Sequence, residues 1–278
     1  MAPANHASHP VESLRESSKW LETSMRSCLA HPRTEAVHRL RTSTRRVEAQ
    51  LALLSMLPSL PPHEEQKRKA LRLLKRLRQA AGQVRDIDVQ RELIRAEAAV
   101  AGGAPSPDRG LRSEARRLRR QLKRTRNEEA DHLLKVLNEQ RDELPLVFAE
   151  LENALAPVRS LALSEPDLIA LVRDWYASRR EPDPPKAPYS TAELHEIRKR
   201  AKLARYLAES APRSAVAARH LAAQFAALQQ AGGEWHDRLV LAEIATAELG
   251  RSAKLAQLFA AQASSALRAF KRRLRYKI

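Results

Sequence analysis

Two segments of the chain place a histidine, an arginine and a further cation at intervals of three and then four residues. On an α-helix these intervals put the three side chains on one stripe, roughly 60° wide. The two basic stripes are His38, Arg41 and Arg45 in the first segment, and His195, Arg198 and Lys202 in the second, 157 positions later. Guanidinium and ammonium groups donate charge-assisted hydrogen bonds to phosphate oxygens, so each stripe is suited to binding an anion.

Apolar residues occupy the other side of both expected helices. Leu40 and Val47 lie well over 100° from the first stripe, and Leu194 and Ile197 begin the apolar side of the second helix. One side of each helix is therefore expected to pack into a core while the other faces an anion. The neighbouring cations that extend the stripes are Arg46, Lys199 and Arg205.

His38 and His195 occupy the same point of the two stripes, which favours a ligand role for both. A bound phosphate would favour the imidazolium form, and anion binding is then expected to strengthen as the pH falls. The alternative is a pair of structural histidines at a helix interface.

A second pair of related segments follows the stripes in the same order. They are Gly82-Gln83-Val84-Arg85-Asp86 and Gly233-Glu234-Trp235-His236-Asp237, 151 positions apart. The glycines are expected to end one helix, and the aspartates to lie near the positive start of the next. Arg85 could also face the anion, with His236 at the corresponding position. Two paired motifs in one order predict an internal duplication.

The charge of the chain fits a protein that binds anions along an extended surface. Lys and Arg number 50 against 33 Asp and Glu, a formal net charge of +17, which attracts polyanions. Residues 67–95 hold ten basic and three acidic side chains, residues 109–126 nine and one, and residues 268–277 six and none. Weaker candidates from the first two of these segments are Lys75, Arg78, Arg116, Arg119 and Lys123.

The composition predicts an all-α protein. Only seven glycines occur in the chain, and few β-branched or aromatic residues are available to build strands. Helices are expected at about residues 11–30, 34–57, 62–81, 84–101, 109–143, 166–180, 191–210, 213–230, 234–249 and 251–275. Two antiparallel helical bundles are the simplest way to pack them.

Proline clusters indicate how the chain is divided. Residues 181–188 contain four prolines, which forbid a continuous helix and favour an extended connector. Thr191 is expected to cap the helix that follows. The predicted parts are a disordered N-terminus over residues 1–10, a first helical repeat over 11–143, a connecting segment with a helix and the proline-rich linker over 144–190, and a second helical repeat over 191–278.

Together these features resemble the CHAD domain, the conserved-histidine α-helical domain. The resemblance rests on the two stripes, the segment Val84-Arg85-Asp86-Ile87-Asp88-Val89 and the doubled helical layout, and it spans about residues 12 to 277. It implies two bundles related by a pseudo-twofold axis, whose basic helices face a shared central groove or pore. It also implies binding of inorganic polyphosphate and association with polyphosphate granules.

Cysteine usage and hydropathy indicate the setting. Cys28 is the single cysteine and cannot close an intrachain disulfide, which suits a reducing compartment. The N-terminus has no apolar stretch resembling a signal peptide, and no segment approaches the roughly 20 apolar residues needed to cross a bilayer. A cytoplasmic protein without membrane insertion is expected.

Non-specific nucleic-acid binding is the main alternative, because phosphate backbones attract the same cations. Against it, eleven residues in all are Phe, Trp or Tyr, which leaves few stacking platforms for single strands. No helix-turn-helix, zinc-finger or RNP signature occurs. A scaffold whose basic C-terminal run recruits an acidic protein or a membrane surface is a third possibility.

A metal-dependent phosphohydrolase is a weaker alternative that would use Asp86, Asp88 and Asp237. The nearest histidine–acid pairs, His195-Glu196 and His236-Asp237, are adjacent in sequence, so their side chains point in different directions on a helix. We therefore expect no enzymatic activity, no catalytic residue, no metal and no cofactor.

Overall fold

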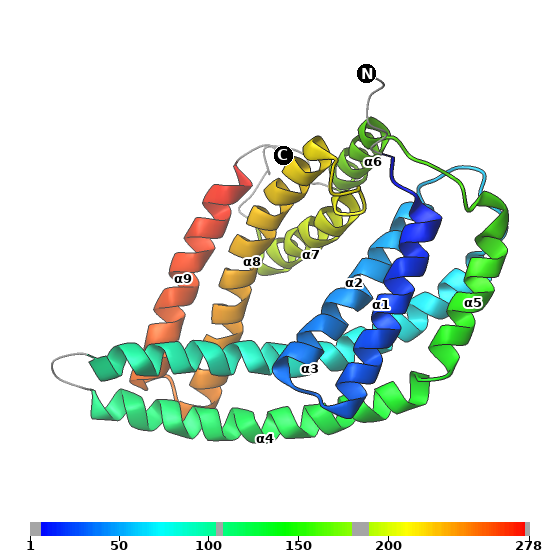
Figure 1. Cartoon of the computed structure of the whole chain (residues 1–278). Coiled ribbons are helices and arrows are strands. Elements are labelled where there is room, and N and C mark those ends of the chain that lie inside the picture. The colour runs from blue at the N-terminus through cyan, green and yellow to red at the C-terminus, as the bar shows by residue number, and fades with distance from the viewer. Residues whose placement is uncertain (1–6, 104–107, 180–188, 276–278) are drawn as a thin grey trace. The chain divides into compact units, whose positions relative to one another are not determined.

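The computed structural model describes residues 7–103, 108–179 and 189–275 (Figure 1). The helices are α1 (Pro10–Ala30), α2 (Thr34–Leu54), α3 (Glu64–Gly103), α4 (Arg109–Gln140), α5 (Glu143–Leu155), α6 (Glu165–Ala177), α7 (Thr191–Ala208), α8 (Val216–Leu249) and α9 (Lys254–Leu274), with a 3₁₀ turn, η1 (Ala156–Val158). No strand occurs among the described residues, which confirms the all-α fold class. None of the described helices is both long and apolar enough to span a membrane.

Two helices are longer than the sequence predicted. α3 continues through Gly82 and α8 continues through Gly233, so the predicted helix ends at these glycines are wrong. An interior glycine costs a helix only about 1 kcal/mol relative to alanine, which burial of neighbouring apolar side chains readily offsets. Asp86 and Asp237 consequently lie inside helices and cap neither one.

The chain forms two compact units. Unit 1 comprises the described residues within 1–79 and 134–229, and unit 2 those within 80–133 and 230–277. Each unit therefore combines residues from both predicted repeats, and α3, α4 and α8 contribute to both units. The duplication, the pseudo-twofold axis and the central groove stay predictions from the sequence and the resemblance.

In unit 1, α2 packs against α1 through the apolar side that the sequence predicted. Leu40, Val47 and Leu51 are buried, whereas His38 on the other side of the helix is exposed. Where the two helices face each other, the hydroxyl groups of Ser24 and Ser43 form a buried hydrogen bond of 2.9 Å. Cys28, four residues after Ser24, is also buried. The pairing fixes which side of α2 is available to a ligand.

The start of α7 is set by a capping box. The Ser190 hydroxyl accepts a hydrogen bond from the Glu193 amide, and the Glu193 carboxylate accepts one from the Ser190 amide, so the cap is Ser190 and not Thr191 as predicted. Leu194 and Ile197 then begin the buried side of the helix, as the sequence predicted. The predicted proline-rich linker, residues 181–188, lies outside the described residues.

The N-terminal segment is described from residue 7 onwards. Ser8 pairs with Leu163 through two backbone hydrogen bonds of 2.8 Å, and its hydroxyl donates to the Ser210 carbonyl oxygen. Pro10 then begins α1. The segment predicted as disordered includes residues 7–10. The structure instead places these residues against the rest of unit 1.

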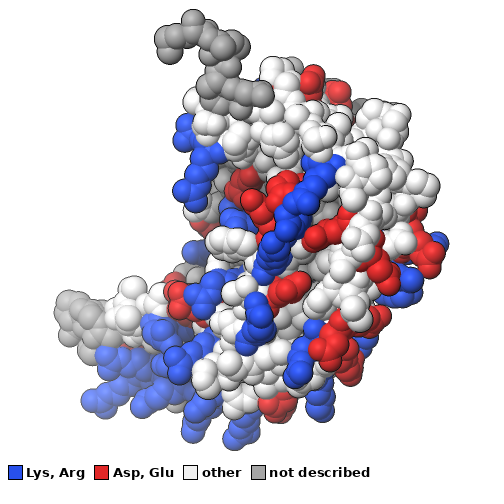
Figure 2. Space-filling view, turned by 45° about the vertical axis from the view of Figure 1, so that its right-hand side comes forward, with Lys and Arg blue, Asp and Glu red and all other residues white. Residues whose placement is uncertain are grey.

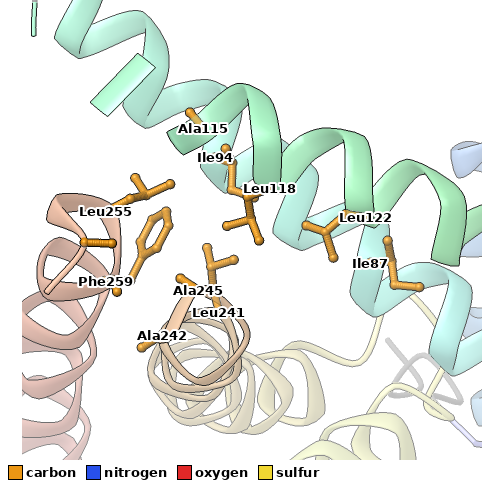
Figure 3. Packing of buried hydrophobic residues seen from close by; sticks show 12 residues of the cluster. Ile87, Ile94, Ala115, Leu118, Leu122, Leu241, Ala242, Ala245, Leu255 and Phe259 are labelled. Atoms are coloured by element: carbon orange, nitrogen blue, oxygen red, sulfur yellow. The ribbon is translucent and has the colours of Figure 1, made fainter. Parts of the chain in front are cut away.

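Unit 2 has its own core, drawn in Figure 3, in which side chains of α3, α4, α8 and α9 point toward one another. The ring of Phe259 on α9 is fully buried in this cluster, together with Leu118 of α4 and Leu241 of α8. Trp235 of α8 stacks on Phe270 of α9 with ring centroids 5.8 Å apart. Aromatic residues of unit 2 are therefore used for packing.

Candidate anion-binding site

Both basic stripes lie in unit 1, on α2 and α7, and these two helices contact each other. Their C-terminal ends are joined by a 2.8 Å hydrogen bond from the Gln50 side-chain amide to the Ser210 hydroxyl. His38 is exposed, and the other members of the stripes are half-buried: Arg41, Arg45, His195, Arg198 and Lys202. Segments predicted to belong to separate repeats thus meet in one unit.

Glu48 holds two arginines of different helices. Its carboxylate accepts hydrogen bonds from Arg45 of α2 at 3.1 Å and from Arg78 of α3 at 2.8 Å. Burial lowers the pKa of the Arg45 guanidinium, Glu48 opposes this effect, and the nearby positive charges of Arg78 and Arg41 add to it. The guanidinium stays charged at neutral pH because arginine begins so far above it. Its Nε atom is buried without a hydrogen-bond acceptor, so the group has hydrogen-bonding capacity that the protein leaves unused.

Tyr206 links the arginines of α2 to those of α7. Its side chain is buried, and burial raises the pKa of the phenol, while Arg205, Arg46 and Arg45 act in the opposite direction. The Arg205 guanidinium lies over the ring at 5.4 Å and donates to Glu209 at 2.6 Å and to Gln229 at 3.3 Å. The phenol keeps its proton, and arginines of both α2 and α7 are near enough to act on its pKa.

Beside Tyr206 lies a cavity of ≈ 490 Å³ whose wall is predominantly basic. It is lined by Arg46, Arg205, Arg213 and Arg219, by Glu209, and by the alanines Ala208, Ala211, Ala222, Ala223 and Ala226. We call it the arginine cavity. Its one acid, Glu209, is paired with Arg205. The alanines add only short apolar side chains to a wall whose charged groups are mostly guanidinium groups.

A second cavity of ≈ 500 Å³ shares Arg46, Glu209, Ala211 and Arg213 with the first and extends toward α1. There its wall includes the carboxylates of Glu12 and Glu16. Because these carboxylates repel anions, an anion is favoured more in the arginine cavity than in this second cavity.

Arg213 and Arg219 were not among the residues predicted from the sequence. Arg213 lies in the turn before α8 and Arg219 in its first turns, and neither belongs to a repeated motif. Arg213 lies five residues after the end of α7, whereas Arg219 reaches the cavity from α8, which contacts α7 where Arg205 donates to Gln229. No signal in the sequence alone would have found them.

Of the residues predicted from the sequence, Arg46 and Arg205 line the arginine cavity. The six stripe residues do not line it, and neither does Arg78: the stripe residues are His38, Arg41, Arg45, His195, Arg198 and Lys202. The other predicted residues lie elsewhere. Lys199 of α7 pairs with Glu196 at 2.7 Å, and Lys75 is exposed on α3. Five predicted residues belong to unit 2: Arg85, Arg116, Arg119, Lys123 and His236. Figure 2 shows Lys and Arg side chains gathered over α4, where three of these five lie. His236 contacts Asp237 at 3.3 Å.

The part of the chain that the structure describes offers no group of three or more His, Cys, Asp or Glu side chains that could hold a metal ion. Of the acids considered for a phosphohydrolase, Asp88 is buried and pairs with Arg126 at 3.0 Å. This ion pair connects α3 to α4.

Comparisons with known proteins agree with this architecture. The family model of the CHAD domain matches residues 14–246. The structure of PptA from Streptomyces chartreusis superposes with a TM-score of 0.64 at 19% sequence identity, covering 96% of this chain and 98% of that chain. The CHAD domain from the plant Ricinus communis superposes with a TM-score of 0.60 at 18% identity, covering 98% and 90%. At such identities the likeness shows the fold. No curated protein matches the chain.

Proposed function

The chain belongs to the CHAD domain family, and from that premise we propose that it binds inorganic polyphosphate through the cations of α2, α7 and the start of α8. The observation that carries the proposal is the arginine cavity, where four arginines from three segments line one wall with a single acid among them. We further propose that the protein works in the cytoplasm at polyphosphate granules.

The chemistry of polyphosphate matches this arrangement. The polymer is flexible and carries about one negative charge per phosphate, so it needs a series of donors and no single shaped pocket. Arginine offers forked donors to the phosphate oxygens, and lysine adds point charges along the way. Arg46, Arg213 and Arg219 are exposed, so a long chain can reach all three. The stripes of α2 and α7 extend the basic surface beyond the cavity.

The proposal is tested by removing the three exposed arginines of the cavity. Arg46→Gln, Arg213→Gln and Arg219→Gln are combined in one variant, because none of the three forms an ion pair with a described residue. Its affinity for long-chain polyphosphate, measured by fluorescence anisotropy, is expected to fall by at least about tenfold, since charged hydrogen bonds contribute roughly 1.5–3 kcal/mol each.

The control removes three other exposed arginines of unit 1: Arg26, Arg33 and Arg173. This variant, again with glutamine at each position, has the same net charge as the first. It should lose less than about threefold in affinity, the effect of a weaker general attraction. Equal losses in both variants would show that polyphosphate binds by diffuse charge and would overturn the proposed site.

A further inference from the structure

Unit 2 contains a cavity of opposite character to the arginine cavity. It has a volume of ≈ 370 Å³ and lies between α3, α4 and α8. Its wall carries four carboxylates, those of Asp86, Glu129, Asp237 and Glu248, and no Lys or Arg side chain. His236 also lines it and contacts Asp237 at 3.3 Å. In a chain with a net charge of +17, such a wall is unexpected. We call it the acidic cavity.

A buried amide on the same wall lacks a hydrogen-bond partner. Gln90 lines the acidic cavity, is 5% exposed, and its carbonyl oxygen is buried without a donor. A buried acceptor without a donor is costly, and native proteins usually supply the donor from water or a ligand. Gln90 differs from other buried amides in lining a cavity, so a water molecule or a ligand there can supply the missing donor.

The carboxylates do not converge on a single ion. Among the described residues, no three acidic or histidine side chains are grouped closely enough to hold a metal. Between the carboxylates the wall is apolar, with Ile87, Leu122, Val240 and Ile244. Ile87 and Leu122 also belong to the core cluster of unit 2, where Figure 3 shows them. A fitting ligand therefore has separated positive charges joined by an apolar spacer.

We propose that the acidic cavity binds an aliphatic diamine or polyamine. Its ammonium groups would donate hydrogen bonds to the carboxylates and to the Gln90 carbonyl oxygen, because each primary ammonium carries three donors. Its methylene chain would lie along Ile87, Leu122 and Ile244. The volume falls within the usual range of small-molecule sites, roughly 300–1,000 Å³. The proposal is independent of polyphosphate binding, because no residue of the arginine cavity takes part.

The test is calorimetric titration of the full chain, free of polyphosphate, with 1,4-diaminobutane, spermidine, 1-aminobutane and Mg²⁺. The two compounds with several ammonium groups should bind at one site per chain. 1-Aminobutane should bind at least about tenfold more weakly, since it can engage only one end of the cavity. Equal affinity for the monoamine, or tighter binding of Mg²⁺, would overturn the proposal in favour of general cation attraction or a metal site.

Two variants with the same loss of negative charge locate the site. Glu129→Gln with Glu248→Gln changes the cavity wall, whereas Glu128→Gln with Glu243→Gln changes exposed neighbours on the same two helices. The first pair should weaken diamine binding by about tenfold or more, and the second by less than about twofold. Equal effects of the two pairs would contradict the proposed site.

A third variant covers the case in which the first does not fold. Gln121→Lys, on the wall of the cavity, adds a tethered ammonium group among the carboxylates. It should abolish diamine binding and leave the melting temperature unchanged or higher. A folded Gln121→Lys protein that binds 1,4-diaminobutane as the wild type does would refute the proposal. Polyphosphate affinity should be unaffected in Glu129→Gln with Glu248→Gln, so the two proposals fail or stand separately.

Discussion

Glu48 is the residue on which two arginines of the candidate site converge. Its side chain is 15% exposed, and it holds Arg45 and Arg78 in place from two different helices. Two cations kept together by one acid leave a net positive charge near α2. The ion pairs therefore serve stability while the local charge stays suited to an anion.

Replacing Glu48 with Gln should separate these two roles. The variant is expected to lose about 1–3 kcal/mol of unfolding free energy, because two partly buried guanidinium groups lose their counter-charge. Polyphosphate should then raise its melting temperature by more than it raises that of the wild type, since the ligand supplies the missing negative charge.

Urea denaturation and thermal melting measure both effects. Glu150→Gln, at an exposed position of α5, is the control and should change stability by less than about 0.5 kcal/mol. A stable Glu48→Gln protein with the same ligand-induced shift as the wild type would show that Glu48 does not organise these arginines.

Buried amides offer a second test at the same scale. Gln140 is fully buried, and both polar atoms of its side chain lack hydrogen-bond partners among the described residues. Gln140→Met should therefore stabilise the protein by about 1–2 kcal/mol in urea denaturation. Gln50→Met is the matched change at a buried glutamine that donates to Ser210, and it should destabilise. Destabilisation by both would indicate that Gln140 has an ordered water partner.

At the scale of whole helices, the sequence predicted the faces of α2 and α7 but not the continuity of α3 through Gly82 and of α8 through Gly233. Spacing determines which residues share a face, and Leu40, Val47 and Ile197 are buried as expected. The continuity of a helix through a glycine depends on tertiary packing, which outweighs a penalty of about 1 kcal/mol.

The candidate site was only partly predictable for the same reason. Arg45, Arg46 and Arg205 were predicted from the sequence, and all three act on the pKa of the same phenol, Tyr206, but only Arg46 and Arg205 of the three line the arginine cavity. Arg213 and Arg219 join them at the cavity only in the folded chain. Their approach depends on non-local packing, which no local sequence pattern encodes. The alanines that line the cavity carried no signal, because alanine is common in any helix.

Two glycines, one within α8 and one directly after it, should respond in opposite ways to replacement by alanine. Gly233 lies within the helix, and a Cβ atom there would meet nothing within 4 Å. Gly233→Ala is expected to stabilise the protein by about 0.5–1 kcal/mol. Gly250 follows the helix with φ of 90°, a conformation that strains other residues, so Gly250→Ala should destabilise. Urea denaturation compares the two; destabilisation by Gly233→Ala would argue for a break in α8.

At the scale of the whole molecule, the net charge of +17 and the arginine cavity make different contributions to binding. The net charge attracts any polyanion and is screened by salt. In the proposed function, the cavity adds donors in a fixed arrangement, which would distinguish one polyanion from another. Duplex DNA is stiff over roughly 150 base pairs, whereas a polyphosphate chain can bend into the cavity.

The most direct measurement of the central claim is a competition experiment with the wild-type protein. Labelled long-chain polyphosphate is bound first, and unlabelled duplex DNA of equal total charge is added as competitor, over a series of NaCl concentrations. We predict that affinity for both falls as salt rises, but that polyphosphate stays bound at about 150 mM NaCl while DNA no longer competes. Equal competition by DNA at every salt concentration would contradict the account, because the protein would then recognise phosphate charge alone.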